Sequence, residues 1–89
     1  MSWTIRFNPK ALAELSGLDR QIQKRILKFF TERLRLHNNP RQLGAALTGE
    51  LVGLWKYRIG DYRTICQIND KEITVLVLKV GHRKDVYKH

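Results

Sequence analysis

The chain has 89 residues, and its 17 Lys and Arg against 8 Asp and Glu give a formal charge of +9. A chain of this length forms one domain with a modest core, here residues 1–89, which excludes a large active site built from several parts. So large a positive excess favours a polyanionic partner, with nucleic acid as the leading class and an acidic protein as the alternative.

The first part of the chain predicts a strand followed by a short helix. Residues 3–7 are aromatic and β-branched, which is typical of a strand, and Asn8-Pro9 then marks a turn or a helix start. Proline suits the first helical turn, because the amide hydrogen that it lacks would have no partner there. We therefore expect a strand over residues 3–7 and a helix over about residues 9–15, which Gly17 ends.

A second and longer helix is expected over roughly residues 20–37. Asp19 can cap it, and apolar residues recur along it at helical spacing, namely Ile22, Ile26, Phe29, Phe30 and Leu34. The run His37-Asn38-Asn39-Pro40 ends it. The stretch that follows, through Gly49, has the composition of a loop with room for a short turn of helix.

From Leu51 onward the apolar pattern changes from helical to strand-like, in three runs over about residues 53–59, 62–69 and 72–80. The separators between these runs are short, so the runs should form an antiparallel meander. The order β-α-α-β-β-β predicts a small α+β domain in which two N-terminal helices pack on one side of an antiparallel sheet.

Several kinds of chemistry are disfavoured by what the chain lacks. Cys66 is its one cysteine, which excludes an intramolecular disulfide, and its strand-like setting favours a packed thiol over a nucleophile. The eight carboxylates are scattered and no phosphate-binding glycine-rich loop is present, so we expect no metal and no cofactor. The N-terminus lacks the apolar core of a signal peptide and no window approaches ~18 apolar residues, so we expect cytoplasmic residence and no membrane partner.

The most informative feature is a set of cations within the strand-like part of the chain. If Gly60-Asp61 is a two-residue hairpin loop, Arg58 faces Arg63 across the ladder and strand alternation puts Lys56 on the same face. The residues that point the other way can cover the core: Trp55, Tyr57, Ile59 and Tyr62. Like charges opposite one another destabilise a sheet, and a bound phosphate would neutralise them. The alternative is that all three are solvated surface cations.

The end of the last strand returns to the level of Arg63. It carries Gly81-His82-Arg83, and then Tyr87, to the same end of the sheet. The register of this second hairpin is not fixed by the sequence, so we predict proximity for Arg83 and Tyr87 rather than a shared face. A tyrosine packed on the sheet and a structural His82 are the alternatives to direct roles.

Such a cluster could promote attack of a ribose 2′-hydroxyl on the adjacent phosphorus of RNA. Guanidinium groups suit the stabilisation of the phosphorane, since their forked donors pair with phosphate oxygens and keep their charge. Lys56 or Tyr87 could transfer the proton if positive neighbours favoured their deprotonated forms. His82 belongs to the residue type that titrates nearest neutrality, so the identity of the proton-transferring group stays open.

Two segments together match the pattern of a known family. Residues 54–63 read LWKYRIGDYR and residues 80–87 read VGHRKDVY, and with the element order they resemble the RelE toxins of the RelE/ParE superfamily. The resemblance implies a toxin of a type II toxin–antitoxin system that enters the ribosomal A site and inhibits translation. It further implies that the toxin is a metal-independent endoribonuclease, an mRNA interferase that cleaves mRNA by 2′-hydroxyl attack and leaves a cyclic phosphate.

The resemblance also implies roles for individual residues. Lys56 and Arg58 match the family's basic pair, of which the first helps with proton transfer and both hold phosphate charge. Arg63 and Arg83 match its two phosphate-stabilising arginines. Tyr87 matches its C-terminal tyrosine, implicated in orienting or activating the 2′-hydroxyl and in stacking on a base. Arg58 stands where many members have lysine, which leaves proton transfer to Lys56 or Tyr87.

The partners implied by the resemblance are mRNA, the ribosome and a cognate RelB-like antitoxin with an acidic tail, with operator DNA reached only through the toxin–antitoxin complex. Further cations are candidates for RNA binding, with an ordinary solvated surface as the alternative: Lys24, Arg25, Lys28, Arg35 and Lys84. A ParE-like inhibitor of DNA gyrase, which shares the scaffold without the catalytic set, is the alternative function. A third reading is a toxin relic with weakened catalysis or a plain RNA-binding module.

Overall fold

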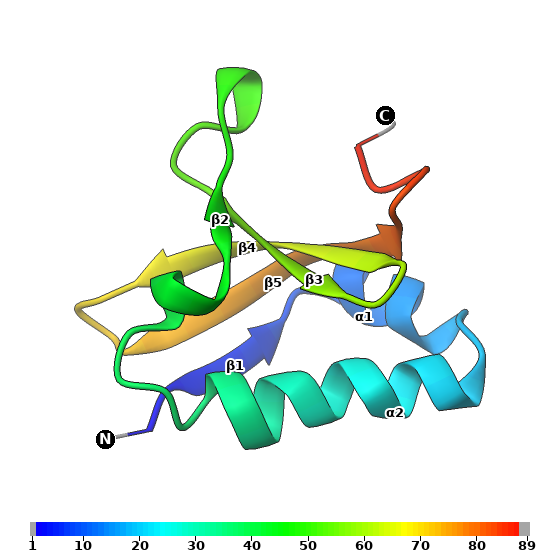
Figure 1. The fold of residues 1–89 in the computed structure, drawn as a ribbon, viewed down its shortest axis with the longest axis horizontal. Coiled ribbons are helices and arrows are strands. Elements are labelled where there is room, and N and C mark those ends of the chain that lie inside the picture. Colours follow the sequence, from blue (N-terminus) through cyan, green and yellow to red (C-terminus); the bar gives the residue numbers. More distant parts are fainter. Residues whose placement is uncertain (1, 88–89) are drawn as a thin grey trace.

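The computed structural model describes residues 2–87 and consists of a five-stranded sheet with two α-helices. The predicted helices and the four predicted strands are all present, and one short strand is an addition (Figure 1). In chain order the elements are β1 (Thr4–Phe7), α1 (Pro9–Ser16), α2 (Arg20–Lys28), a π-helical segment (Phe29–Leu34), a 3₁₀ turn (Pro40–Leu43), β2 (Ala45–Ala46), a second 3₁₀ turn (Gly49–Leu51), β3 (Trp55–Ile59), β4 (Tyr62–Asn69) and β5 (Thr74–His82).

The sheet has the strand order β1-β5-β4-β3-β2, and its centre is the predicted antiparallel meander of β3, β4 and β5. The α+β class is confirmed. The sheet is mixed rather than wholly antiparallel, because β1 lies parallel to β5 with Ile5 paired to Val75. A parallel neighbour needs a long crossover connection, which the helices and the meander supply here. Local sequence patterns do not reveal which edge a distant strand joins.

Both helices begin as the sequence predicts. The Asn8 side chain accepts a hydrogen bond from the Ala11 amide at 2.7 Å, with a proline in the first turn of α1, and Asp19 accepts from the Gln21 amide at 3.1 Å at the start of α2. These bonds satisfy amides that have no partner inside the helix.

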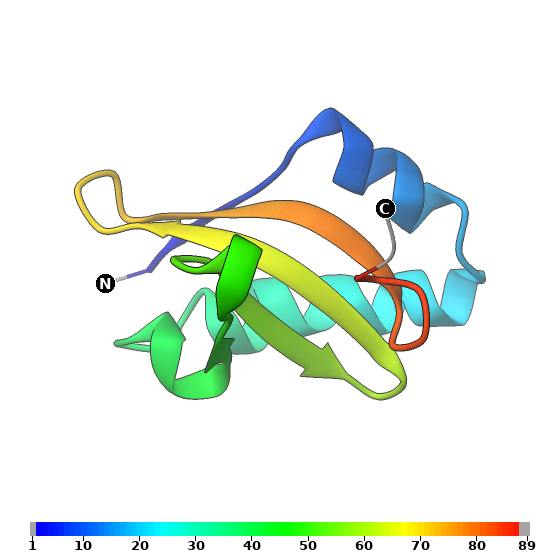
Figure 2. The same ribbon diagram turned by 90° about the horizontal axis from the view of Figure 1, so that it is seen from above.

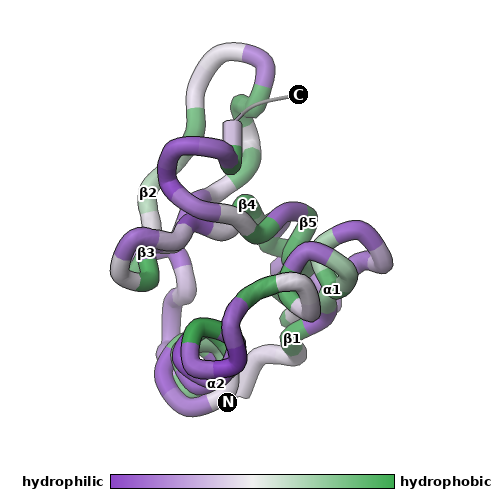
Figure 3. Tube along the Cα trace, turned by 90° about the vertical axis from the view of Figure 1, so that its right-hand side faces the viewer, coloured by the Kyte–Doolittle hydropathy of each residue, from purple (hydrophilic) through white to green (hydrophobic). Residues whose placement is uncertain are grey.

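One hydrophobic core joins both helices to the sheet. Figure 1 shows α2 running below the sheet, and Figure 3 shows hydrophobic and hydrophilic segments alternating along it, as expected of a helix with one face on a core. Within residues 2–87, no helix is both long and apolar enough to cross a membrane. The buried residues of the core are Trp3, Ala11, Leu15, Ile26, Phe30, Leu34, Tyr57, Ile59, Cys66, Val75, Val77 and Val80.

The second helix is shorter than predicted and changes form along its length. Its α-helical part ends at Lys28, and a π-helical segment, Phe29–Leu34, completes it. Within that segment the adjacent rings of Phe29 and Phe30 both pack against Tyr57, with centroids 5.6 and 6.0 Å from its ring. Segments of this wider helical form are often found at functional sites.

The side chain of Tyr57 connects β3 to the loop that precedes β2. Its ring is fully buried, and its hydroxyl donates a hydrogen bond to the Pro40 carbonyl oxygen at 2.8 Å. Burial raises the pKa of Tyr57, so the hydroxyl stays neutral and serves as a donor. A Cβ atom at Gly44 would lie 2.7 Å from the Tyr57 ring, so only glycine fits this crossing.

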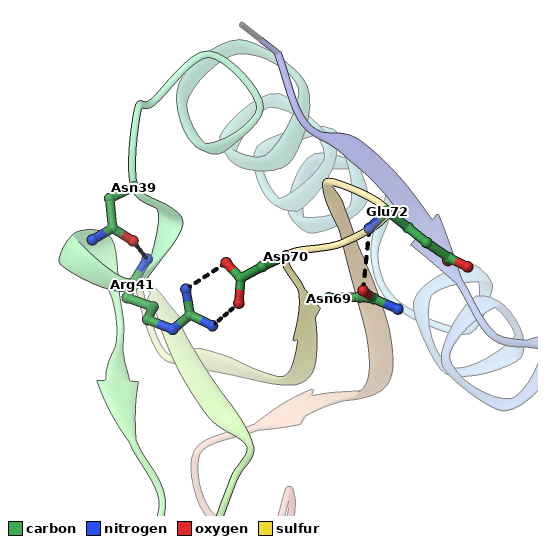
Figure 4. A network of polar contacts seen from close by, with 5 residues as sticks. All are labelled: Asn39, Arg41, Asn69, Asp70 and Glu72. Carbon is green, nitrogen blue, oxygen red and sulfur yellow. Dashed lines mark hydrogen bonds and ion pairs between the residues drawn. The ribbon is translucent and has the colours of Figure 1, made fainter.

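A bidentate ion pair fixes the same loop to the turn between β4 and β5 (Figure 4). Arg41 donates from Nη1 and Nη2 to the two carboxylate oxygens of Asp70, at 2.9 and 2.7 Å, and its guanidinium lies over the Trp55 ring. The hydrogen bond from Arg41 lowers the pKa of Asp70. In this turn Ile73 has a φ of 51°, so β5 begins at Thr74 rather than at the predicted position 72.

Replacing Tyr57 by phenylalanine should lower the free energy of unfolding by about 1–2 kcal/mol, because the buried carbonyl of Pro40 loses its donor. Urea denaturation measures this change. Tyr62→Phe is the matched control, since no hydrogen bond joins the Tyr62 hydroxyl to another residue in the range 2–87, and it should shift stability by less than about 0.5 kcal/mol. Equal stability of both variants would contradict the assignment.

The thiol of Cys66 should be unreactive in the folded protein. It is fully buried, donates to the Thr64 hydroxyl at 3.6 Å, and burial raises its pKa from 9.0 to about 12. A shift of this size lowers the thiolate fraction near neutral pH by ~10³-fold. Reaction with an aromatic disulfide reagent should therefore be slower by at least that factor in the native protein than in guanidinium chloride. Comparable rates in the two conditions would show that the thiol is accessible.

Candidate active site

The candidate site is built on the two-residue turn between β3 and β4. Gly60 has a φ of 60° and Asp61 does not have a positive φ, which is the φ pattern of a type II′ hairpin turn. The ladder pairs Ile59 with Tyr62 and Arg58 with Arg63, as the sequence predicts. The turn therefore sets which side chains share a face.

Three cations gather on the face of the sheet that points away from the aromatic core. Lys56, Arg58 and Arg63, here called the cationic face, alternate along β3 and β4 with residues of the core. Tyr57 and Ile59 are buried on the opposite face as predicted, and Tyr62 packs against the core. Trp55 differs from the prediction, because it is half-buried and stacks with Arg41 outside the core cluster.

The cationic face lines a hollow of about 260 Å³, whose remaining wall is formed by Gly44 and Ala45. Ala45 is placed there by β2, which pairs it with Lys56. In the part of the chain that the structure describes, none of the three cations forms an ion pair with a carboxylate. The hollow therefore presents uncompensated positive charge to the outside.

Arg63 is held rigidly within this hollow. Its Nη1 donates to two backbone carbonyl oxygens, that of Gly60 at 2.8 Å and that of Tyr62 at 2.9 Å. Both bonds use one nitrogen, so Nε and Nη2 keep donors for a ligand. A guanidinium that is oriented before a ligand arrives stabilises developing charge without reorganisation.

The segment that follows β5 lies beside the turn between β3 and β4 (Figure 2), and Arg83 is its first residue. Its amide donates to the Asp61 carbonyl oxygen at 2.8 Å, and its Nε lies 3.9 Å from an Asp61 carboxylate oxygen. Both side chains are more than half exposed, so this ion pair is weak. The backbone bond places Arg83 beside the β3–β4 turn, while its side chain is free to exchange Asp61 for a phosphate.

His82 is not brought to the cationic face. It pairs with Tyr62, and because successive strand residues point to opposite faces, it lies on the other side of the sheet from Arg63. Its ring packs edge-on against the Tyr62 ring at 5.5 Å, and its Nδ1 accepts a hydrogen bond from the Lys84 amide at 3.2 Å. These contacts favour the structural role for His82.

Tyr87 lies on the same side of the sheet as the cationic face, next to the buried residue Val86. Val86 is buried and lies against Gly81, since a Cβ atom added at Gly81 would be 3.6 Å from the Val86 Cβ. Gly81 in turn is the ladder partner of Arg63. Tyr87 itself is 41% exposed and lines an apolar hollow of about 210 Å³ together with Ile65, the ladder partner of Lys56. The phenol is thus on the same side of the sheet as the cations.

Lys79 lies beside the candidate site, although the sequence did not point to it. It pairs with Ile65 in the register of β4 and β5, and it lines the same hollow as Tyr87. A register irregularity between Ile65 and Cys66 interrupts the ladder. Residue pairs counted from the turn between β4 and β5 therefore do not place Lys79 opposite Ile65.

The remaining predicted RNA-binding cations are spread over the surface. Arg25 and Lys28 line a hollow beside α2, whereas Lys24, Arg35 and Lys84 are exposed outside it. Among residues 2–87, no cluster of three His, Cys, Asp or Glu side chains could hold a metal ion.

Known proteins match both the sequence and the fold. Residues 5–87 match the family model described as the ParE toxin of type II toxin-antitoxin system, parDE. Toxin RelG of Mycobacterium tuberculosis (strain ATCC 25618 / H37Rv) is 35% identical over 89 residues, 99% of each chain. Toxin RelE of the same strain is 38% identical over 53 residues, 60% of this chain and 55% of that protein.

Two solved structures extend the comparison. The chain resembles one in the crystal structure of the toxin-antitoxin complex RelBE2 from Mycobacterium tuberculosis, with a TM-score of 0.85, 32% identity, and coverage of 93% of this chain and 100% of that one. For the archaeal RelE-RelB complex from Pyrococcus horikoshii OT3 the TM-score is 0.72 at 27% identity, covering 97% of this chain and 100% of that one. The family resemblance of the sequence is confirmed, and the chain belongs to the RelE/ParE family of toxins from type II toxin–antitoxin systems.

Proposed function

We propose that the protein is a ribosome-dependent endoribonuclease that cleaves mRNA in the ribosomal A site without a metal and thereby inhibits translation in the cytoplasm. The observation that carries the proposal is the cationic face, in which Arg63 is oriented by the turn carbonyls and lacks a carboxylate partner. The similarity of the chain to toxins RelG and RelE supports a toxin function.

The proposed reaction is an internal phosphoryl transfer. The ribose 2′-oxygen attacks phosphorus and forms a new P–O bond, and the bond to the 5′-oxygen breaks, which leaves a 2′,3′-cyclic phosphate and a 5′-hydroxyl. Arg63, with Arg58 and Arg83 beside it, stabilises the charge on the phosphorane oxygens. Lys56 or Tyr87 accepts the 2′ proton or delivers one to the 5′-oxygen.

The openness of the site explains why we propose a requirement for the ribosome. The cationic face is a shallow hollow on a sheet surface, with β2 as a low wall on one side. Such a surface neutralises phosphate but does little to align the 2′-hydroxyl with the breaking bond. A ribosome that holds the mRNA can supply this alignment, which is worth several powers of ten in rate.

We propose a RelB-like antitoxin with an acidic tail as the protein partner, and contact with operator DNA only through that complex. Two of the similar structures are toxin–antitoxin complexes, RelBE2 from Mycobacterium tuberculosis and RelE-RelB from Pyrococcus horikoshii OT3. The formal charge of +9 favours an acidic segment as strongly as it favours RNA.

Inhibition of DNA gyrase is the second candidate, because the matching family model is described by the ParE toxin. Such an activity would not depend on the side chains that stabilise a phosphorane. The two functions therefore differ in which substitutions remove them.

Arg63→Ala should lower single-turnover cleavage of mRNA on programmed ribosomes by roughly 10²-fold or more, because an oriented charge stabiliser is lost. Arg83→Ala should have an effect on the same scale. Lys71→Ala is the control, since it removes one charge at an exposed turn at the far end of β4, and it should cleave normally. Normal cleavage by Arg63→Ala would remove this residue from the mechanism.

Growth and supercoiling assays separate the two candidate functions. Expression without antitoxin should stop growth for the wild type but not for Arg83→Ala, and the purified wild type should leave DNA supercoiling by gyrase unchanged. The first expectation follows from a catalytic role for Arg83 beside the cationic face, and the second follows from mRNA as the proposed target. If Arg83→Ala and Tyr87→Phe stay toxic and the protein inhibits supercoiling, gyrase is the target.

A further inference from the structure

A second positively charged hollow lies between the helix and β3, and it shares Arg58 with the cationic face. Its volume is about 330 Å³, and we call it the helix groove. It is lined by Arg25, Lys28 and Arg33 from the helix and by Arg58 from β3, with Glu32 as its carboxylate. Figure 3 shows β3 above α2 in a side view, and residues of both elements line the groove.

The groove exists because part of β3 has no outer neighbour. β2 pairs with Trp55 and Lys56 and goes no further, so the edge of β3 beyond them borders the helix. There the Arg25 guanidinium lies directly over the turn, and a Cβ atom at Gly60 would be 2.7 Å from its Nη1. Glycine thus allows an arginine from the helix to approach the hairpin backbone closely.

The π-helical segment supplies the rest of the lining. Phe29 lines the groove while its ring packs against Tyr57 at 5.6 Å, which fixes it to the core. The guanidinium of Arg33 lies 5.8 Å from the centre of the same ring. An aromatic ring beside oriented cations is a common arrangement in grooves that bind single-stranded nucleic acid.

The charges of the groove are not balanced from within the protein. Across residues 2–87, neither the four cations nor Glu32 takes part in an ion pair. Four positive side chains around one hollow repel one another, and a polyanion would relieve this repulsion and release its counterions.

Arg58 connects the groove to the proposed site of cleavage. This residue lines both the helix groove and the hollow of the cationic face. A chain of phosphates held at Arg63 can therefore continue past Arg58 towards Lys28 and Arg33. An acidic peptide could follow the same path, but the shared arginine makes the groove an extension of a phosphate-binding surface.

We infer that the helix groove is a second RNA-binding site, which holds the phosphate backbone of RNA on the far side of Arg58 from the cleaved bond. The inference rests on the proposed function for the choice of RNA as the polyanion. The mRNA strand and ribosomal RNA offer the same phosphodiester chemistry, and binding experiments can tell them apart.

The test compares two double variants, each of which removes the charges of one lysine and one arginine. Lys28→Gln/Arg33→Gln alters the groove and spares the cationic face, while Arg20→Gln/Lys71→Gln removes one lysine and one arginine at exposed positions outside both hollows. Binding is measured against salt concentration with two probes: a single-stranded RNA oligonucleotide carrying 2′-O-methyl groups, which has no attacking hydroxyl, and ribosomes free of mRNA. Thermal unfolding of each variant checks that the fold is kept.

For the oligonucleotide, the groove variant should show a log–log salt slope that is shallower by about 1.4, since two phosphate contacts are lost at about 0.7 each. Its affinity at low salt should fall by roughly 10-fold. The control variant should keep the wild-type slope. A loss seen with the oligonucleotide identifies the mRNA strand as the occupant, and a loss seen with ribosomes alone identifies ribosomal RNA; either supports the inference.

Three outcomes would overturn it. The groove is not an RNA site if neither probe distinguishes the two double variants from wild type, or if both variants lose affinity equally, which indicates net charge alone. It is a protein-binding surface instead if the groove variant weakens binding of polyglutamate while RNA binding is unchanged. Neither probe is cleaved, so a failure of the proposed mRNA cleavage would leave these results standing.

Discussion

The type II′ turn at Gly60 is the constraint on which the rest of the site depends. Its positive φ is costly for residues with a Cβ, and its two-residue length fixes Arg58 opposite Arg63. A slip of one residue would turn Tyr57 and Ile59 outward and bring cations into the core. The hydrophobic core and the cationic face are therefore two consequences of a single register.

The same turn gathers arginines from three parts of the chain. Arg63 donates to its first carbonyl, the guanidinium of Arg25 lies over its backbone, and the Arg83 amide donates to the carbonyl of Asp61. Charges of one sign repel when brought together, and here backbone carbonyl dipoles and one exposed carboxylate offset part of that repulsion. Because the two bonds of Arg63 use only its Nη1, its Nε and Nη2 keep donors with which a phosphate can complete the neutralisation.

The features that the sequence predicted are those set by near neighbours in the chain. The Arg58–Arg63 pair follows from a two-residue turn, and the helix caps follow from local residue types. The parallel pairing of β1 and the short strand β2 depend on contacts between distant segments, which no local pattern specifies. The position of Lys79 depends on a register irregularity, which is equally absent from local patterns. The opposite orientation of His82 likewise required the register of the second hairpin.

Strand alternation keeps the candidate chemistry separate from the stability of the fold. On β3 the side chains of Lys56 and Arg58 lie on the outer face, while Tyr57, held between them, is fully buried and hydrogen-bonded to Pro40. Opposed arginines cost stability, and a core of buried aromatic rings behind them opposes local opening of the strands. Function can thus be built from a locally unfavourable pattern of charge because the other face of the same strands holds their geometry.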